Sequence, residues 1–375
     1  MLYIQGVVRY GGALESLYQL VSHPELSPFS PLVVTSGEGL LTEKLEAAGV
    51  RHAIVPMGMW RKAKNWVRLP LTLKMLRDLA KREGISLVHC NTLWDAPYGA
   101  HLGKRLGLPV VVHLRNTFTP DKIEKYRLNK ADRVIAVSKA VATPLQEWAE
   151  KVEVVHNGVD LRVFDPTKEK GEGVREELGL PRDAPILLLV GRVDTTKGQD
   201  IAITALSMLK ADPHPHLLFA GEASTQEHRW PGVLRGLASE LGVADRVHFL
   251  GNRNDIPRLM AAATVVLVPS LESAKEGFGR VAIEAMAMCK PVVASNTGGL
   301  PEVVVRDTGI LVPPGDARAL AEAVESLLND PERSVALGEA GRKRVEELFD
   351  LRLTVSRIKE IYHQLLGEGK CPEVN

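Results

Sequence analysis

Short apolar segments alternate with longer amphipathic segments along most of the 375-residue chain, and this alternation limits the possible folds more than any other feature. In the first part of the chain the apolar runs are LYIQGVV, PLVVTS, HAIVPM, SLVHCN, PVVVHL and RVIAVS. After about residue 165 they are ILLLVG, HLLFAG, VHFLG, VVLVPS, PVVAS and GILVPP. Runs that are apolar on both faces and separated by helix-length segments are typical of parallel strands in βαβ units. The two series therefore predict an α/β chain with two doubly wound sheets.

A charged segment divides the two series. Residues 160–185 carry three prolines and two closely spaced glycines and lack a strand pattern, so we place the domain boundary within them. The predicted domains are residues 1–165 and residues 166–349, each long enough to bury its own core. We expect the C-terminal helix, at about residues 350–370, to pack back on the first domain.

Composition excludes several classes of protein. The 47 Lys and Arg residues nearly balance the 46 Asp and Glu residues, and a net charge of +1 argues against nucleic-acid binding. Cys90, Cys289 and Cys371 are far apart and odd in number, so they predict neither a disulfide framework nor a metal cluster. No apolar stretch approaches the roughly 20 residues of a membrane span. The N-terminal apolar run is too short for a signal peptide, so we expect a cytoplasmic protein.

The residues that follow each apolar run are the candidate ligand-binding residues, because open parallel sheets bind ligands beyond the carboxyl ends of their strands. In the first domain, Gly11 and Gly12 open a predicted helix whose N–H groups could approach an anion. No GxGxxG fingerprint is present, and a tight turn is the alternative interpretation. His113 ends the run PVVVHL, where an imidazole is either a structural residue or an acid–base catalyst.

Two cations follow a strand of the second domain. The segment LLLVGRVDTTKGQD ends its strand at Gly191 and continues with Arg192 and Lys197 before a helix that begins near Gln199. Arginine chelates two oxygens and lysine acts as a mobile point charge, so the pair suits a diphosphate. The segment is not a Walker loop, because GxxxxGK[ST] is absent. The alternative is a pair of solvated surface cations.

The segment EGFGRVAIEAMA carries two carboxylates, Glu276 and Glu284, on either side of an apolar run. Within one helix they would lie about 12 Å apart along the axis, too far to act as a pair on one bond. The glycines between them predict instead that Glu276 lies in a loop and that a helix begins near Gly279. The backbone N–H groups of residues 278–281 would then form an anion site between two hydrogen-bond acceptors. A nucleotide sugar has this length and polarity.

A second glycine pair stands in VVASNTGGLPEVV. Gly298 and Gly299 precede Pro301 and Glu302, which suit the first turn of a helix. Free N–H groups there are candidates for holding phosphate oxygens, and plain helix capping is the alternative.

These segments together resemble glycosyltransferase family 4, whose members are retaining enzymes with the GT-B fold of two Rossmann-like domains facing across a cleft. The resemblance covers essentially the whole chain, and its parts occur in the family's order. They are Gly11–Gly12, VVHNGVD at 154–160, GRVDTTKG at 191–198, EGFGRVAIEAMA at 276–287 and GGLPEVV at 298–304. The spacing of the two glutamates around Gly-Phe-Gly is the most specific element.

The resemblance implies a role for each candidate residue. Glu276 matches the glutamate that binds hydroxyls of the transferred sugar, and Glu284 matches the one that grips the ribose hydroxyls. Arg192 and Lys197 match the cations that neutralise the diphosphate, and His113 matches the histidine beside the reacting carbon. The implied catalytic residues are His113 and Glu276. The implied donor-binding residues are Gly11, Gly12, Arg192, Lys197, Arg253, Gly277, Phe278, Gly279, Arg280, Val281 and Glu284.

Three further positions complete the resemblance. Arg253, in FLGNRND, falls where the nucleobase usually stacks or bonds. The family often has an acidic residue directly after Gly-Gly-Ala, whereas here Leu14 intervenes before Glu15, which leaves the role of Glu15 open. Arg115, in HLRN, adds a charge to which the resemblance assigns no role.

The resemblance implies transfer of a hexosyl unit from a nucleoside-diphosphate sugar to a hydroxylated acceptor, such as a cell-envelope glycan, a lipid-linked acceptor or a small metabolite. The cations and helix N-termini would stabilise the departing diphosphate electrostatically. No cofactor is implied, and no Asp-x-Asp motif follows a strand, so a metal is not needed. Alternatives on the same fold are a nucleotide-sugar epimerase and a sugar phosphorylase. A non-catalytic nucleotide-sugar-binding protein is a further alternative.

Residues 59–83 are a candidate for peripheral membrane contact. The segment holds eight Lys or Arg residues, only two acidic residues, and two tryptophans, Trp60 and Trp66. Aromatic rings and cations favour the headgroup layer of an anionic bilayer. The alternative is a Rossmann helix with solvated cations. Its buried stripe would then consist of Leu71, Leu73, Leu76 and Leu79.

Overall fold

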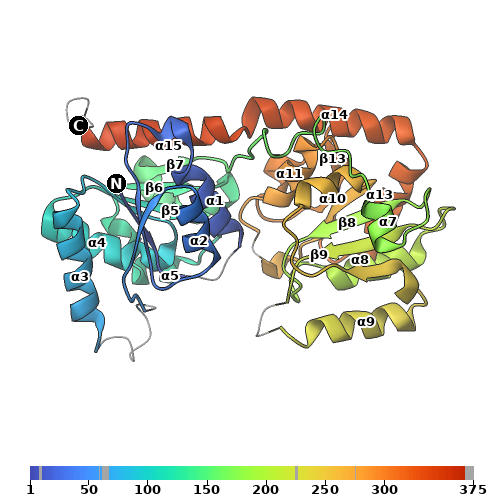
Figure 1. Cartoon of the computed structure of the whole chain (residues 1–375), viewed down its shortest axis with the longest axis horizontal. Helices are drawn as coiled ribbons and strands as arrows, with labels where there is room; N and C mark the ends of the chain where they lie inside the picture. The colour runs from blue at the N-terminus through green and yellow to red at the C-terminus, as the bar shows by residue number, and fades with distance from the viewer. Residues whose placement is uncertain (8–10, 59, 61–66, 224–226, 275, 368–375) are drawn as a thin grey trace. The chain divides into compact units, whose positions relative to one another are not determined.

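The computed structural model describes residues 1–367 except 8–10, 59, 61–66, 224–226 and 275. It divides into two compact units (Figure 1). Unit 1 comprises residues 1–158 together with the chain from residue 351 onward, and unit 2 comprises residues 159–350. The chain therefore leaves unit 1 after Gly158 and returns to it at Leu351.

Unit 1 contains a seven-stranded sheet in which every pairing is parallel. Its strands are β1 (Leu2–Gln5), β2 (Leu32–Thr35), β3 (Arg51–Ile54), β4 (Val88–Cys90), β5 (Val110–Leu114), β6 (Arg133–Ala136) and β7 (Val152–Val154). Their order is β3-β2-β1-β4-β5-β6-β7. The strands β1, β2, β4 and β5 are buried along their whole length, as expected for a parallel sheet covered on both faces.

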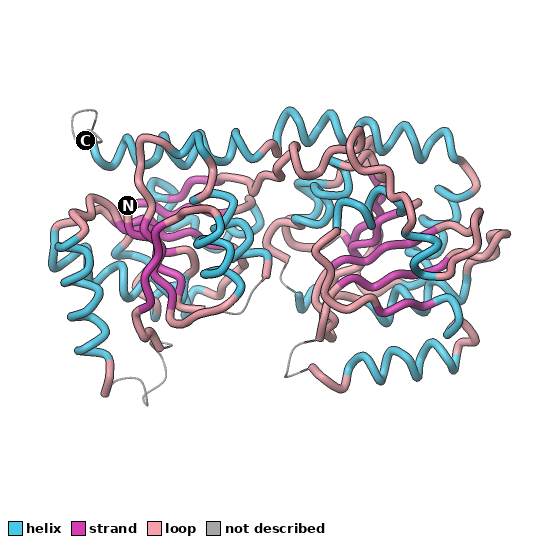
Figure 2. The backbone as a smooth tube through the Cα atoms, viewed as in Figure 1, coloured by secondary structure: helices cyan, strands magenta, loops and turns pink. Residues whose placement is uncertain are grey.

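Helices cover both faces of this sheet (Figure 2). They are α1 (Gly12–Val21), α2 (Leu40–Ala47), α3 (Leu69–Arg82), α4 (Ala96–Leu106), α5 (Pro120–Lys125), α6 (Lys139–Ala142) and α15 (Leu351–Leu366). The helix α15 contributes Val355, Ile358, Ile361 and Tyr362 to the same buried cluster as Tyr3 of β1. Each of these four side chains is at most 1% exposed, and full burial of such a side chain contributes about 1.5–3 kcal/mol.

Unit 2 contains a six-stranded parallel sheet in the order β10-β9-β8-β11-β12-β13. Its strands are β8 (Ile186–Val190), β9 (His216–Ala220), β10 (Val247–Phe249), β11 (Val265–Val268), β12 (Val292–Ser295) and β13 (Gly309–Val312). Its helices are α7 (Val174–Leu178), α8 (Gln199–Met208), α9 (Trp230–Glu240), α10 (Ile256–Ala262), α11 (Arg280–Ala287), α12 (Leu300–Val303), α13 (Ala317–Leu328) and α14 (Pro331–Leu348).

Both sheets reverse their strand order once. In unit 1 the chain runs outward from β1 to β3 and then returns to the other side of β1 at β4. In unit 2 the same reversal lies between β8 and β11. Loops diverge at such a reversal and leave a crevice beyond the carboxyl ends of the two strands, which is where doubly wound sheets bind ligands. The reversals therefore indicate where a site is expected in each unit.

The prediction of two doubly wound sheets is confirmed, and every predicted apolar run contains a strand. The sequence prediction missed β7, which is only three residues long and half-buried because it pairs with β6 alone. The stripe expected for α3 is confirmed only in part. Leu76 and Leu79 are buried and Leu73 is half-buried, but Leu71 is 61% exposed and Thr72 takes its place against the core. Thr72 is buried there because its hydroxyl donates to the carbonyl of Pro56.

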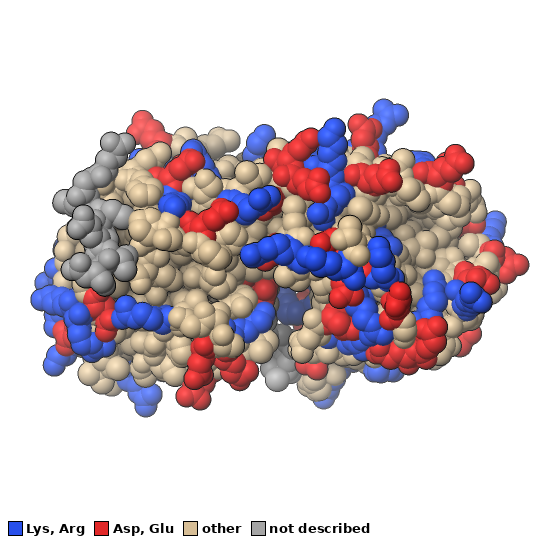
Figure 3. All heavy atoms as spheres, turned by 45° about the horizontal axis from the view of Figure 1, so that its top comes forward, with Lys and Arg blue, Asp and Glu red and all other residues tan. Residues whose placement is uncertain are grey.

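The predictions made from the cysteines, the hydropathy and the net charge can also be compared with the structure. Cys90 and Cys289 are free thiols, and Cys371 lies outside the described residues. Among the described helices, none is both long enough and apolar enough to cross a bilayer. Positive and negative side chains are interspersed over the face shown in Figure 3, which agrees with the near-zero net charge. Of the basic segment 59–83, residues 59 and 61–66, including Trp66, lie outside the described residues.

Candidate functional site

The loops after β8 and β11 are joined at the strand reversal of unit 2. Gly198 begins α8 from a left-handed backbone (φ 72°), and a Cβ there would lie 2.1 Å from the carbonyl oxygen of Pro269. The amide of Leu271 donates to the carbonyl of Thr196 at 2.8 Å. Only a glycine permits the first of these approaches. The loop that carries the two predicted cations is therefore fixed against the end of β11.

Lys197 and Glu276 meet across this reversal. The Lys197 ammonium lies 2.6 Å from Oε2 of Glu276, and the Ser270 hydroxyl donates to the same oxygen at 3.3 Å. The side chains of Lys197 and Glu276 are 24% and 18% exposed, so the pair is sheltered but open to solvent. A charge pair of this kind holds a cation in place while leaving it able to bind an arriving anion.

Arg192 lies in a different environment. Its guanidinium is 53% exposed and pairs with Asp194 at 3.1 Å. Asp194 is itself fixed because it accepts from the amide and the hydroxyl of Thr196. Arg192 is thus oriented by its own loop, whereas Lys197 is oriented by the loop of the neighbouring strand.

The helix α11 begins at Arg280, as the glycines of EGFGRVAIEAMA predict. Gly279 caps it with a left-handed backbone (φ 101°). Glu276 precedes the helix, and Glu284 lies just over one turn inside it, where its carboxylate accepts from Arg280 at 3.0 Å. Phe278 is 2% exposed and packs edge-on against Phe349, with ring centroids 5.5 Å apart. This buried ring anchors the loop before the helix, so the N-terminal amides have a fixed position.

The second glycine pair supports the backbone of Glu276. The amide of Gly299 donates to the Glu276 carbonyl at 3.0 Å. A Cβ on Gly298 would lie 2.1 Å from that carbonyl oxygen, and one on Gly299 would lie 2.5 Å from the carbonyl oxygen of Gly277. The segment GGLPEVV therefore presses on EGFG through backbone atoms, which explains why two adjacent glycines stand there.

Arg253 is committed to ion pairs in unit 2. It chelates both carboxylate oxygens of Asp255 at 2.8 and 2.7 Å and contacts Glu177 at 2.6 Å. These carboxylates raise the pKa of Arg253. Arg253 and Asp255 follow β10, two strands away from β8, whereas Glu177 belongs to α7. Its predicted nucleobase contact stays a prediction, and it would use the flat face of the guanidinium rather than these N–H groups.

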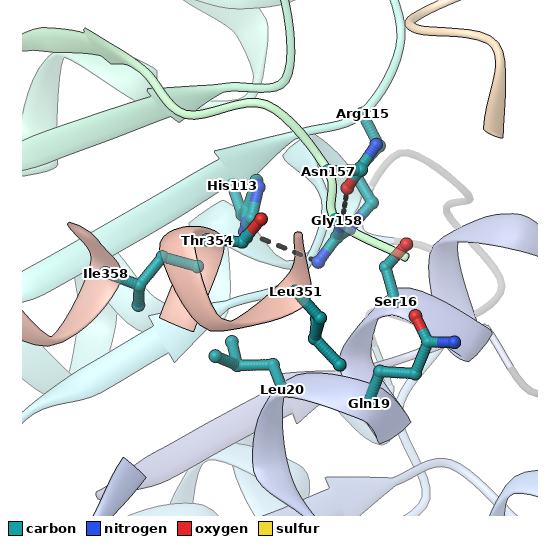
Figure 4. Close-up of a pocket in the computed structure, with 10 residues that line it drawn as sticks. All are labelled: Ser16, Gln19, Leu20, His113, Arg115, Asn157, Gly158, Leu351, Thr354 and Ile358. Atoms are coloured by element: carbon teal, nitrogen blue, oxygen red, sulfur yellow. Dashed lines mark hydrogen bonds between the residues drawn. The ribbon is translucent and has the colours of Figure 1, made fainter. Parts of the chain in front are cut away.

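In unit 1, His113 occupies the penultimate position of β5 and is 1% exposed. Its Nδ1 lies 3.3 Å from a terminal nitrogen of Arg115, and its Nε2 has no hydrogen-bond partner among the described residues. Burial, with further contributions from Arg115 and His89, holds the pKa of His113 well below its usual range. The ring is therefore neutral near neutral pH. Figure 4 shows His113 at the wall of a small pocket within unit 1.

Arg115 is the centre of a buried polar network that the sequence analysis missed. Its Nε and Nη2 donate to Oδ1 of Asn91 at 3.1 and 2.7 Å, and its Nη1 donates to Oδ1 of Asn157 at 3.0 Å. Asn91 in turn donates to the side chain of Gln5 and to the carbonyl of Ala13. Asn91 and Asn157 were detectable in the sequence, because one follows the run SLVHC and the other lies in VVHNGVD. Because their side chains are neutral and common in loops, nothing in the sequence indicated that these asparagines lie next to Arg115.

The glycine pair of unit 1 stands at the start of α1. Gly11 is the N-cap and Gly12 the first helical residue, which agrees with the predicted helix start. Upstream, the amide of Gly6 donates to the buried Asp95 at 2.8 Å. Burial raises the pKa of Asp95 to about 7. Glu15 forms an ion pair with Lys44 at 2.6 Å, so the acidic residue of this helix contacts a neighbouring helix.

No group of three or more His, Cys, Asp or Glu side chains is arranged to hold a metal ion in the part of the chain that the structure describes. The site residues that the structure brings together are Lys197, Glu276, the N-terminus of α11 and the Gly298–Gly299 turn in unit 2. In unit 1 it joins His113, Arg115 and two asparagines.

Two family descriptions match this chain. Residues 172–344 match Glycosyl transferases group 1, and residues 10–163 match Glycosyltransferase Family 4. D-inositol 3-phosphate glycosyltransferase 1 of Catenulispora acidiphila is 34% identical over 360 residues, which cover 88% of this chain and 84% of that protein. The chain therefore belongs to glycosyltransferase family 4.

Other similar proteins extend the comparison. D-inositol 3-phosphate glycosyltransferase of Corynebacterium aurimucosum is 33% identical over 287 residues, which cover 72% of this chain and 66% of that protein. The chain thus spans less than two thirds of the length of several curated relatives that it matches. The crystal structure of Anabaena HepE in complex with UDP and glucose has a TM-score of 0.84 and 26% identity, covering 96% of this chain and 98% of that one. This likeness confirms the GT-B fold.

Proposed function

We propose that this chain transfers a hexosyl unit from a nucleoside-diphosphate sugar to a hydroxylated acceptor, with retention at the anomeric carbon. One observation carries the proposal. Lys197, Glu276 and the N-terminus of α11 converge at the strand reversal of unit 2, where a doubly wound sheet binds its ligand. HepE, which shares the fold, binds UDP and glucose, so a uridine diphosphate sugar is the first donor to test.

The proposed reaction breaks the bond between the anomeric carbon and the diphosphate and forms a bond from an acceptor oxygen on the same face. The acceptor proton passes to an oxygen of the departing diphosphate. Lys197, Arg192 and the α11 amides would stabilise the negative charge that grows on the diphosphate, which is usually the largest contribution to such a rate. Glu276 would bind sugar hydroxyls and support the positive charge on the ring. Glu284 would accept from the ribose hydroxyls.

The acceptor class rests on the relatives. Those with printed activities are named for D-inositol 3-phosphate and L-malate, both of which carry hydroxyl groups and anionic groups. We propose a small hydroxylated acid or a cell-envelope glycan as the acceptor. An epimerase or phosphorylase would use the same donor site. Release of free nucleoside diphosphate only when an acceptor is present separates glycosyl transfer from both.

The experiment that tests the donor site compares two conservative variants. Glu284→Gln should weaken binding of free nucleoside diphosphate, because the ribose contact exists without a sugar. Glu276→Gln should leave that binding nearly intact and lower turnover. Calorimetry with uridine and guanosine diphosphates, followed by turnover assays with the intact nucleotide sugars, measures both effects. The reverse pattern would show that the donor lies in the opposite orientation.

We also propose that α3 contacts an anionic membrane surface, which would suit a lipid-linked acceptor. Val67, Leu71 and Met75 are spaced four residues apart and are 88%, 61% and 39% exposed. Leu71 and Met75 lie one turn apart on one face of α3, Val67 stands in the turn before the helix, and Arg68 and Lys74 lie beside them in the sequence. Apolar side chains flanked by cations are suited to the headgroup layer, where each basic residue contributes about 1 kcal/mol.

Co-sedimentation with vesicles tests this contact. We expect binding to phosphatidylserine-containing vesicles at low salt and little binding to phosphatidylcholine vesicles. The variant Leu71→Ser/Met75→Ser should bind less, whereas Val335→Ser, which changes an exposed apolar residue of unit 2, serves as the matched control. Wild-type protein left wholly in the supernatant would remove the proposal and leave glycosyl transfer untouched.

A further inference from the structure

Two buried histidines of unit 1, His89 and His113, each have an Nε2 without a hydrogen-bond partner among the described residues, and of the two only His113 lines the pocket of Figure 4. His113 is 1% exposed, and its Nε2 makes no hydrogen bond with any described residue. Leaving such a group unsatisfied costs about 1–3 kcal/mol, so its retention needs an explanation. His113, Arg115 and Asn157 line the same pocket of unit 1 (Figure 4). A ligand group that enters this pocket is the natural partner for Nε2.

The other ring nitrogen determines what Nε2 can do. Nδ1 of His113 lies 3.3 Å from Nη2 of Arg115. A guanidinium has five N–H donors and no acceptor, and it stays protonated throughout the physiological range. Nδ1 must therefore accept this hydrogen bond, and a neutral imidazole that accepts at Nδ1 carries its proton on Nε2. Burial favours the neutral ring most strongly, and the cationic Arg115 beside it acts in the same direction to hold the pKa of His113 well below its usual range.

Arg115 cannot readily turn away from the histidine. Asn91 accepts from two of its nitrogens and Asn157 accepts from a third. Asn91 is oriented in turn, because its amide nitrogen donates to Gln5 and to the carbonyl of Ala13. The acceptor oxygen of Asn91 must therefore face the guanidinium. Each member of the chain from Gln5 to Arg115 fixes the orientation of the next.

We propose that Arg115 is a positioning residue that holds His113 as the neutral Nε2–H tautomer, so that Nε2 donates a hydrogen bond to an oxygen of a substrate that enters the pocket of unit 1. The identity of that ligand rests on the proposed glycosyl transfer, whereas the tautomer does not. In this arrangement Nε2 has no lone pair to offer, so His113 does not act as the base that takes the acceptor proton. This also gives Arg115 the role that the resemblance left unassigned.

Nitrogen NMR of protein labelled with ¹⁵N-histidine tests the tautomer directly. The His113 signals are assigned by their loss in His113→Gln. We expect Nε2 to be protonated and Nδ1 to be unprotonated at neutral and alkaline pH, because burial holds the pKa of the ring well below its usual range. Wild-type protein with the proton on Nδ1 would overturn the proposal, even if the enzyme is fully active. The measurement on wild type needs no variant to fold.

Two substitutions then test the role of Arg115. Arg115→Met removes the donor to Nδ1 and should let the proton distribute between both nitrogens. Arg115→Lys is also a donor only and should keep the proton on Nε2. An Arg115→Met protein that folds, by circular dichroism, and still shows only the Nε2–H form would contradict the proposal. Asn157→Ala, which removes a contact to Arg115 but not to His113, is the control for general disruption of the network.

Kinetics connect the tautomer to catalysis. Arg115→Met should lower kcat by roughly tenfold or more while leaving the affinity for free nucleoside diphosphate unchanged, since the proposed diphosphate contacts of Arg192 and Lys197 lie in unit 2. His113→Gln retains an N–H donor and should keep more activity than His113→Glu, which offers only acceptor oxygens. Equal activity of the glutamine and glutamate variants would overturn the donor role. Absence of any glycosyl transfer in wild type would refute the proposed function and leave the tautomer result standing.

Discussion

The two sheets reverse their strand order in the same way, at β1–β4 and at β8–β11, but the polar groups at the two reversals differ in kind. At β8–β11 they are charged and partly open to solvent, and they are paired with one another. At β1–β4 and the adjacent β5 they are side-chain amides, Arg115, two histidines (His89 and His113) and the carboxyl of Asp95, all nine-tenths or more buried. The same topology thus supports an exchangeable site and a rigid one.

The difference follows from desolvation. A buried charge is tolerated only when its hydrogen bonds are satisfied by fixed partners, so the arginine of unit 1 is enclosed by side-chain amides. A cation that must bind an incoming anion needs a partner that it can share, and Glu276 serves Lys197 in this way. We therefore expect Lys197 of unit 2 to exchange partners when an anion binds, whereas Arg115 of unit 1 should keep its hydrogen bonds.

The two glycine pairs give the largest predicted contrast. Gly298→Ala places a Cβ 2.1 Å from a backbone oxygen at φ 56°, and strain plus overpacking should cost about 2–5 kcal/mol. Gly11→Ala has an extended backbone (φ 170°) and no described atom within 4 Å of the new Cβ, so it should cost at most about 1 kcal/mol. Urea denaturation and nucleotide binding measure both. Equal costs would show that the two turns are equally tolerant.

The buried carboxyl of unit 1 should make stability depend on pH. The pKa of Asp95 is raised from 3.8 to about 7, so between these values the folded chain holds a proton that the unfolded chain releases. Its contribution is fully present below about pH 4 and is lost as pH rises through 7, by at most about 4 kcal/mol. Asp95→Asn keeps one oxygen for the amide of Gly6 and does not titrate.

Denaturation of both proteins between pH 4 and pH 8 tests this expectation. The unfolding free energy of wild type, relative to Asp95→Asn, should fall as the pH rises. Parallel curves for the two proteins would contradict the raised pKa. Thr92→Val removes the hydroxyl that bonds the second carboxyl oxygen, and it is the control for loss of a hydrogen bond without loss of the titrating group.

The smallest predicted contrast lies within unit 2. Lys197→Ala should weaken binding of nucleoside diphosphate by about 1.5–3 kcal/mol, because a sheltered charge-assisted contact is lost. Arg192→Ala should cost less, since its side chain is 53% exposed and already paired within its own loop. Calorimetry at two salt concentrations should show the stronger salt dependence for the contact that Arg192 makes. Unchanged affinity in both variants would exclude these residues from the diphosphate site.

The sequence predicted every described strand except β7, the start of α11 and the strand-end cations, because apolar runs and charged residues after them are local signals. It did not predict that Lys197 would pair with Glu276, which lies 79 residues away and meets it only through the strand reversal. It also passed over Gln5, Asn91 and Asn157, whose neutral side chains are common in loops. Their function depends on burial beside Arg115, and burial of a polar residue cannot be recognised from residue type alone.

Unit 2 is inserted between the two segments of unit 1, and this order has a consequence for synthesis. All six strands of unit 2 leave the ribosome before α15 does, and unit 2 needs nothing from α15 to complete its own buried cluster. Unit 1 must wait, because Val355, Ile358 and Ile361 fill its core from the far side of the insertion. Its N-terminal sheet therefore spends the time needed to translate the whole inserted unit with an uncovered apolar surface. A nascent chain arrested before residue 351 is the species that a chaperone is expected to bind.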